Sequence, residues 1–569
     1  MARRFVALLA LLLVLLPLAR ALAAPAIPPG QEPRVLALLE PYALGEEVTP
    51  GWRVRNVQIE RDHVRLTLAG PDGQSTSLRL HHPEAPEAAS ARAFSGSFAL
   101  VDDGPSAPGA AAVERLRAAV QTQDDGAFWT SFGVVAPDRP PSQVAAPRLG
   151  PLDGLLALGL YALLLSPWAI VRERRAAAPA RPRAPAAFDW LTCLVGLVML
   201  GAVIYASSRA SLTAALHEPE GLRWDLRVYY YASQALADGV SPYVHTDLAQ
   251  FSGRDDLLGC KYPPLTVAAF EPLGRLSFPR ASAIYFGVQG LALAALALLW
   301  LRLVGPFALV AAAALWPYAA RIDLIAGNVS LLEQAIVWSG IAALLAGRRL
   351  TFAVLVALSA VCKAQLLAMA ALIFVVDPRA GPRISLVAGA AFGGFLWLNA
   401  LIFPELTASW VDVAVGTALA ERGFHAPSLL GALVELPGGA ITAALGGLSL
   451  LAASVVTLAR ARRASPLARV LFATVAITLL WPRVKDYSYL ALIPAYAHTV
   501  MSLWTLRPRG PWLGRGLAAL LVLAGAALTA APDDAASLAG DHRPLLFALL
   551  LWLVAGALLW VGAARGETT

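Results

Sequence analysis

Apolar runs alternate with short polar segments along most of the chain. From Pro151 to the C-terminus, runs of about 20 apolar residues recur, and each is long enough to span the hydrocarbon core of a bilayer. Two shorter runs, 350–362 and 365–376, flank Lys363 and predict half-spans. The pattern predicts an all-α polytopic membrane protein with about 12–13 transmembrane helices or half-helices.

The expected full spans follow directly from these runs. They lie at 152–171, 190–208, 281–302, 306–320, 328–346, 382–403, 439–460, 466–481, 488–507, 514–532 and 543–563. An outer loop is expected from Pro404 onwards, before the span at 439–460.

The first 150 residues have a different pattern. "MARR", the apolar "FVALLALLLVLLPL" and "ARALAAPA" predict a signal peptide at residues 1–24, with an uncleaved anchor as the alternative. Residues 25–148 are polar, with strand-like alternation at 52–60, 62–70, 75–83 and 91–101 and helical spacing at 33–44 and 111–121. These features predict a small N-terminal α+β exported domain, which we expect either to bind or orient an acceptor or to pack over the outer loops.

Charge then gives the topology. The formal net charge of +7 comes mostly from arginines in short loops between apolar runs, such as "RERRAAAPARPRAPA". Arginine-rich loops stay in the cytoplasm, so residues 25–148 and the region around 207–280 are expected outside, at the cell (inner or plasma) membrane. No basic helix or aromatic-basic module predicts nucleic-acid binding. Three cysteines have neither metal-site nor disulfide spacing.

The topology gathers a mixture of polar residues at the outer face. They are Asp225, Arg227, Lys261, Tyr262, Arg321, Asp323, Asn328, Lys363, Gln365, His425, Ser428, Arg483, Lys485, Asp486 and Tyr487. A charge embedded at the end of a span is costly unless it has a partner or a function. Each residue alone could be a snorkelling side chain or a headgroup contact. The cytoplasmic loops lack such a mixture, which favours a functional site.

Two segments near this face predict helices that lie in the membrane interface. "DLRVYYYASQALADG" has apolar and aromatic residues at near-helical spacing, and "KYPPLTVAAFEPLGRL" begins with a proline pair. Asp225 precedes the first helix, so the simplest interpretation is that it caps that helix. A lipid-linked substrate would present its headgroup at this depth.

Several motifs resemble those of a known family. An acidic residue at the start of the first large outer loop is followed by "GVSPY" and "YPP", and then by "AGNVSLLEQA", "SAVCKAQLLA", "GFHAPSLLGAL" and "WPRVKDYSYLALIP". In this order they resemble the C-type, multi-spanning glycosyltransferases, and most closely glycosyltransferase family 87, the polyprenyl-phosphate-sugar-dependent, mannosyltransferase-like group. The resemblance covers residues 187–510. Ala326 and Gly327 stand where that family often has Gly and Gln.

The resemblance implies transfer of a sugar, such as mannose or another hexose, from a polyprenyl-phosphate sugar donor to a lipid or glycan acceptor, with inversion. Asp225 would be the catalytic base. Cations would hold the donor phosphate, and polar groups would hold the sugar or acceptor. The phosphate candidates are Lys363, Arg483, Lys485 and Arg321, and the sugar or acceptor candidates are Tyr262, Asn328, Gln365, His425 and Tyr487.

No cofactor and no metal is expected for this chemistry. Asp323 or Asp486 could instead pair with Asp225 around a divalent ion, or Asp323 could form an ion pair with Arg321. Outside the core, we expect residues 149–186 to form the first transmembrane helix with a basic loop, and residues 511–569 to form a transmembrane hairpin.

Three other classes of protein remain as alternatives. A transporter would place charges near the bilayer midplane and show an internal repeat, whereas here the charges lie at one face. A non-enzymatic scaffold would use the exported domain as its binding module. A lipid-linked glycan ligase or polymerase would also use outer arginines, and a pyrophosphate-linked donor would distinguish it.

Overall fold

The fold is known from a computed structural model of the 569-residue chain. The structure describes residues 47–49, 52–59, 63–69, 75–81, 93–95, 98–102, 223–253, 259–420, 428–434, 439–505, 511–529 and 543–565. The signal peptide, the first two expected spans and the basic loop between them lie outside these ranges, so those assignments stay predictions.

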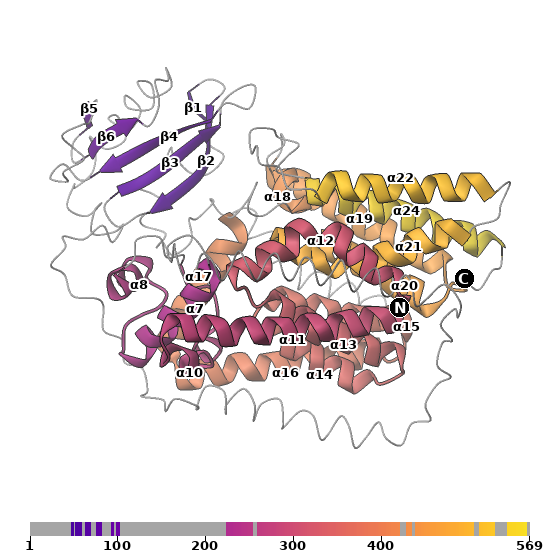
Figure 1. The fold of residues 1–569 in the computed structure, drawn as a ribbon, viewed down its shortest axis with the longest axis horizontal. Coiled ribbons are helices and arrows are strands. Elements are labelled where there is room, and N and C mark those ends of the chain that lie inside the picture. Colours follow the sequence, from indigo (N-terminus) through magenta and orange to yellow (C-terminus); the bar gives the residue numbers. More distant parts are fainter. Residues whose placement is uncertain are drawn as a thin grey trace.

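The described part of the N-terminal region is a six-stranded antiparallel sheet (Figure 1). Its strands run in the order β1-β2-β3-β4-β6-β5. Their bounds are Glu47–Thr49, Trp52–Ile59, His63–Ala69, Ser75–His81, Ala93–Ser95 and Phe98–Asp102 for β1 to β6. The two helices expected at 33–44 and 111–121 lie outside the described residues, so the α+β class of this region stays a prediction.

Most of the described chain is helical. The helices are α7 (Trp224–Ala237), α8 (His245–Ser252), α9 (Pro264–Ala268), α10 (Glu271–Gly274), α11 (Phe278–Val304), α12 (Phe307–Ala326), α13 (Ser330–Leu345), α14 (Arg349–Ala360), η3 (Ala364–Ala371), α15 (Leu372–Val376), α16 (Gly381–Ile402), α17 (Pro404–Ala420), α18 (Leu429–Val434), α19 (Gly439–Arg460), α20 (Pro466–Leu479), η5 (Asp486–Leu492), α21 (Ile493–Thr505), α22 (Pro511–Thr529) and α24 (Arg543–Arg565).

Four of these helices are long and apolar enough to cross a membrane, among the residues described. They are Phe278–Val304, Gly381–Ile402, Gly439–Arg460 and Arg543–Gly562. Several shorter apolar helices, including α13 and α14, lie between them. The predicted class, a helical membrane protein, is therefore confirmed, whereas the number of 12–13 spans stays a prediction.

The break around Lys363 is confirmed, and two other expectations need correction. α14 ends at Ala360, and a 3₁₀ helix, η3, begins at Ala364. The expected loop from Pro404 is wrong, because α17 occupies Pro404–Ala420. The proline-started segment after Lys261 forms two short helices, α9 and α10, and not one.

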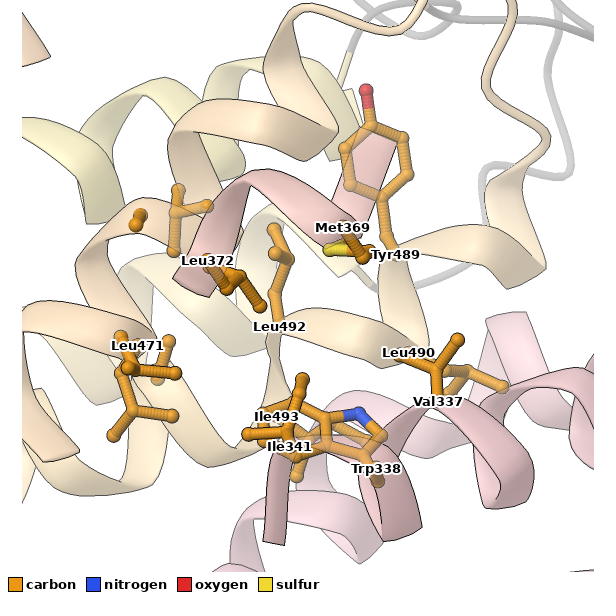
Figure 2. Packing of buried hydrophobic residues seen from close by; sticks show 14 of the residues in the cluster. Val337, Trp338, Ile341, Met369, Leu372, Leu471, Tyr489, Leu490, Leu492 and Ile493 are labelled. Carbon is orange, nitrogen blue, oxygen red and sulfur yellow. The ribbon is translucent and has the colours of Figure 1, made fainter. Parts of the chain in front are cut away.

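The largest hydrophobic core joins helices that are distant in the sequence. Trp338 and Ile341 of α13 pack with Met369 of η3, Leu372 of α15 and residues of η5 and α21 (Figure 2). Because η3 and η5 meet in this core, the segments that precede them, which end at Lys363 and Lys485, are held at the same end of the bundle.

Different helices lie at the two ends of the helical bundle. α7, α8 and α10 lie at one end, on the left in Figure 1, and α15 lies towards the other. Near α15, Arg349 forms a 2.6 Å ion pair with Asp377, which links the α13–α14 turn to the segment before α16. Two arginine-containing loops therefore meet at one end, whereas the orientation of the bundle in the membrane stays a prediction.

Candidate active site

The site begins at a joint between α7 and α12. Arg223 has a left-handed backbone (φ 64°), and its N–H donates to the carbonyl of Ile325 at 3.0 Å. Its Nη1 donates to the carbonyl of Leu324 at 2.6 Å and to Gln289 Oε1 at 3.1 Å. The last carbonyls of a helix lack intrahelical partners, so Arg223 supplies both hydrogen bonds and positive charge there. The start of α7 is thereby fixed on the end of α12.

Gly327 allows this joint to close. It ends α12 with φ +71°, a left-handed conformation that glycine adopts without steric cost. A Cβ added to Gly327 would lie 2.7 Å from the Cβ of Leu226, closer than any side chain can approach. The close contact between α7 and the end of α12 sets Asn328 beside Asp225.

Asn328 connects Asp225 to α13. Its Nδ2 donates to Asp225 Oδ2 at 2.7 Å. Its Oδ1 accepts from the backbone N–H of Ser330 at 2.9 Å and from the Ser330 hydroxyl at 2.8 Å. Asn328 is buried, and so are most residues of α7 around Asp225. The amide is therefore oriented by α13 and presents its donor to the carboxylate.

Lys363 enters the same network from the break between α14 and η3. Its Nζ lies 2.5 Å from Ser330 Oγ, 3.1 Å from Glu333 Oε2 and 3.4 Å from Asn328 Oδ1. Glu333, in the first turn of α13, is almost fully buried. Glu333 is not among the residues predicted from the sequence, although the rule that singled out Lys363, a charge within an apolar run, applies to it equally.

Burial raises the pKa of the Asp225 carboxyl above its usual range. The hydrogen bond from Asn328 and the charges of Lys485, Lys363 and Lys261 oppose this shift, because they favour the ionised form. Lysines from three separate segments therefore act on one carboxylate. A carboxylate with a raised pKa is a stronger base than an exposed aspartate.

Lys261, Arg483 and Lys485 form a second group of charges, which we call the cation cluster. Burial lowers the pKa of the Lys261 ammonium well below its usual value, and the nearby charges of Arg483 and Lys485 lower it further. The Trp410 indole donates to the Lys261 carbonyl at 3.1 Å. Three mutually repelling cations in a half-buried position are what an anionic ligand would neutralise.

Three hydrogen bonds hold the segments of the cation cluster. Asn399 Oδ1 of α16 accepts from the Leu265 N–H at 2.9 Å, and Thr266 Oγ1 donates to the Val361 carbonyl at 3.0 Å. The contact between Thr266 and Val361 anchors the segment after Lys261 to the chain two residues before Lys363. Ser428 Oγ donates to the Pro482 carbonyl at 2.7 Å and so fixes α18 to the segment that carries Arg483 and Lys485.

Aromatic side chains pack against one another near Asp225. The hydroxyl groups of Tyr229 and Tyr262 lie 2.8 Å apart, and Tyr243 donates to the Tyr262 carbonyl at 2.7 Å. The Tyr229 ring lies 4.7 Å from that of Phe270, centroid to centroid. Burial raises the pKa of Tyr262, so its hydroxyl stays protonated and can donate.

The structure brings together some of the residues predicted from the sequence. Asp225, Asn328 and Lys363 lie in one hydrogen-bonded network. Gln365 lies at the start of η3, half-buried, and is not a member of that network. His425 lies outside the described residues, and nothing is described of the side chains of Arg321, Asp486 and Tyr487.

The alternative role of Asp225 as a helix cap is wrong. α7 begins at Trp224 with Arg223 at the N-cap, so Asp225 lies inside the first turn. Asp323 is fully buried in α12, and its carboxylate oxygens find no hydrogen-bond partner within the described part of the chain. Across the same part, no group of three or more His, Cys, Asp or Glu side chains could hold a metal ion.

Comparison with known proteins identifies the class. Residues 261–482 match the model of Glycosyltransferase family 87, which confirms the resemblance for this segment. The match and the apolar helices indicate a membrane glycosyltransferase, which takes a sugar donor and an acceptor as substrates. No curated protein and no solved structure matches the chain. Asp225, Arg483 and Lys485 lie outside the matched segment, so their roles depend on the geometry alone.

Proposed function

We propose that this protein transfers a hexose from a polyprenyl-phosphate sugar to a hydroxyl of a lipid or glycan acceptor, with inversion, on the extracytoplasmic face of the membrane. One observation carries the proposal. The half-buried carboxylate of Asp225 is held by Asn328 within the electrostatic reach of lysines from three segments. A base and a set of cations at one site are what phosphate departure and proton removal require together.

The reaction balances with these groups. The acceptor oxygen attacks C1 of the sugar, and the bond from C1 to the phosphate oxygen breaks. The acceptor proton passes to Asp225, and the electron pair of the broken bond leaves with the polyprenyl phosphate. Inversion needs attack from the side opposite the phosphate, so the base and the phosphate-binding cations lie on opposite sides of the sugar.

The cation cluster is our candidate for the phosphate site. Lys261, Arg483 and Lys485 repel one another, and a phosphate would relieve that repulsion. Arg321 stays a candidate beside them. With several cations available, the departing phosphate does not require a metal ion, and we propose that none takes part.

The aromatic side chains near Asp225 are our candidates for sugar contact. Tyr262 presents a protonated hydroxyl beside Tyr229, near Asp225. Gln365, His425 and Tyr487 remain proposed contacts for sugar or acceptor. The exported sheet region stays a proposed acceptor-binding module. Its extracytoplasmic position is supported by the helical bundle, because the arginine-containing loops meet at the end away from α7.

The test is transfer of labelled sugar by the purified full-length protein. Polyprenyl-phosphate mannose, polyprenyl-phosphate glucose and the corresponding nucleotide sugars are offered separately with membrane lipids as acceptors. Asp225→Asn should fold normally and lose about two to four orders of magnitude in turnover. Asp238→Asn is the matched control, because Asp238 lies exposed at the other end of the same helix, and it should transfer at the wild-type rate.

Three outcomes would overturn the proposal. Robust transfer directly from a nucleotide sugar would refute the assignment of a lipid-linked sugar as the donor. Near-wild-type transfer by Asp225→Asn would remove the base and transfer that role to Asp323 or Asp486. A requirement for a pyrophosphate-linked glycan in place of the monophosphate sugar would instead identify a ligase or polymerase.

A further inference from the structure

The ammonium of Lys363 is enclosed by acceptors of the protein itself. Ser330 Oγ, Glu333 Oε2 and Asn328 Oδ1 lie within hydrogen-bond range, the last at the long limit of 3.4 Å. An ammonium has three N–H donors, so three acceptors match them one for one. Only 15% of the Lys363 side chain is exposed. A lysine that held a donor phosphate would have to give up one of these contacts.

One series of hydrogen bonds leads from Lys363 to Asp225. Lys363 donates to the Ser330 hydroxyl, which donates to Asn328 Oδ1, and Asn328 Nδ2 donates to Asp225 Oδ2. Hydrogen bonds in such a chain polarise and strengthen one another. The chain begins at a cation and ends at the carboxylate proposed as the base.

The same contacts leave the Asn328 amide a single orientation. The Ser330 backbone N–H can only donate, so the atom 2.9 Å from it must be the amide oxygen. The amide nitrogen then faces Asp225. With Oδ2 of Asp225 held in this way, Oδ1 is the oxygen that can accept the proton of the acceptor hydroxyl.

We propose that Lys363, held by Glu333, is a positioning residue that acts through Ser330 and Asn328 on Asp225, and that it does not bind the donor phosphate. The inference rests on the proposed function, because it takes Asp225 as the base. Phosphate binding then belongs to the cation cluster, and Glu333 holds the Lys363 ammonium at the start of the chain.

A comparison of binding with turnover tests this role. The probe for binding is unlabelled polyprenyl monophosphate, the leaving group of the proposed reaction. Lys363→Met should bind it within about threefold of wild type, whereas its kcat should fall by about 10- to 100-fold, the effect of one charge-assisted hydrogen bond. The matched control, Lys485→Met, should show the opposite pattern, with binding weakened at least about tenfold.

A second variant controls for an effect of Lys363→Met on folding. Lys363→Met leaves Glu333 buried beside no cation, so the double variant Lys363→Met/Glu333→Gln removes both charges together. It should remain folded, bind the polyprenyl phosphate and show the same loss in kcat. Glu333→Gln alone should lower kcat in the same direction with donor KM unchanged.

A double-mutant cycle with Asp225→Asn gives the decisive result. If Lys363 acts through Asp225, adding Lys363→Met to Asp225→Asn should change the residual turnover by less than about twofold. The inference would be overturned if the turnover losses of the two single variants multiplied in the double variant, or if Lys363→Met weakened polyprenyl-phosphate binding tenfold or more. In either case an inactive Asp225→Asn would still support the proposed function. An active Asp225→Asn would instead refute the proposed function itself.

Discussion

The joint between α7 and α12 makes Gly327→Ala the sharpest test of how the site is assembled. The new methyl group would lie 2.7 Å from the Leu226 Cβ, so one of the two helices has to move. A left-handed backbone costs alanine about 1–2 kcal/mol. Overpacking costs about 1–3 kcal/mol, so the total is roughly 2–5 kcal/mol.

The effect on activity should exceed the effect on folding. The displaced helix either carries Asp225 or leads directly into Asn328, and the hydrogen bond between these two residues is 2.7 Å long. A shift of about 1 Å in a reacting group can cost about a hundredfold in rate. We expect Gly327→Ala to melt at a lower temperature in detergent and to transfer sugar about a hundredfold more slowly.

The matched control is Gly389→Ala in α16, where an added Cβ would meet no atom within 4 Å. Alanine is the better helix former there, so this variant should melt at or slightly above the wild-type temperature and keep full transfer. Wild-type melting and wild-type transfer for Gly327→Ala would refute the close contact, and with it our account of how Asn328 reaches Asp225.

Three further predictions follow from charge and burial. Because burial raises the pKa of Asp225 and the base must be ionised, the acidic limb of the kcat/KM profile should lie above the usual range of an aspartate and disappear in Asp225→Asn. Because the pKa of Lys261 is lowered, binding of polyprenyl phosphate should weaken as pH rises, and this should happen at a pH below the ordinary lysine range. Lys261→Met should abolish that pH dependence, and a dependence that survives would exclude Lys261 as its source. Arg223→Ala should lower stability by about 2–3 kcal/mol, as judged from thermal unfolding, because buried acceptors on α12 and Gln289 lose a charged donor; an unchanged melting temperature would contradict this.

Long apolar runs made the helices predictable, because a run of 20 apolar residues has few alternatives to a membrane helix. α11, α16 and α19 lie where the hydrophobic pattern placed them. α17 was missed because Glu405 and Asp412 lower the hydropathy of its sequence, although that sequence still forms a helix.

The candidate site could be predicted only in part. Order and spacing of motifs brought out Asp225, Asn328 and Lys363, which the structure joins by hydrogen bonds. The left-handed conformation of Arg223 has no local signal, because it is imposed by carbonyls about a hundred residues later in the chain. Gly327, which departs from the family motif, is explained by contact with α7, and such a contact is not visible in sequence.

The distance along the chain between Asp225 and Asn328 has a consequence during synthesis. The two residues are 103 positions apart, so a ribosome making about 5–20 residues per second needs roughly 5–20 s to reach the partner. During this interval Asp225 has no amide to hold it. α7 is not among the helices long enough to span the bilayer, so the carboxylate can wait in water. Burial of Asp225 is then a late step, completed when the end of α12 emerges and closes on Leu226.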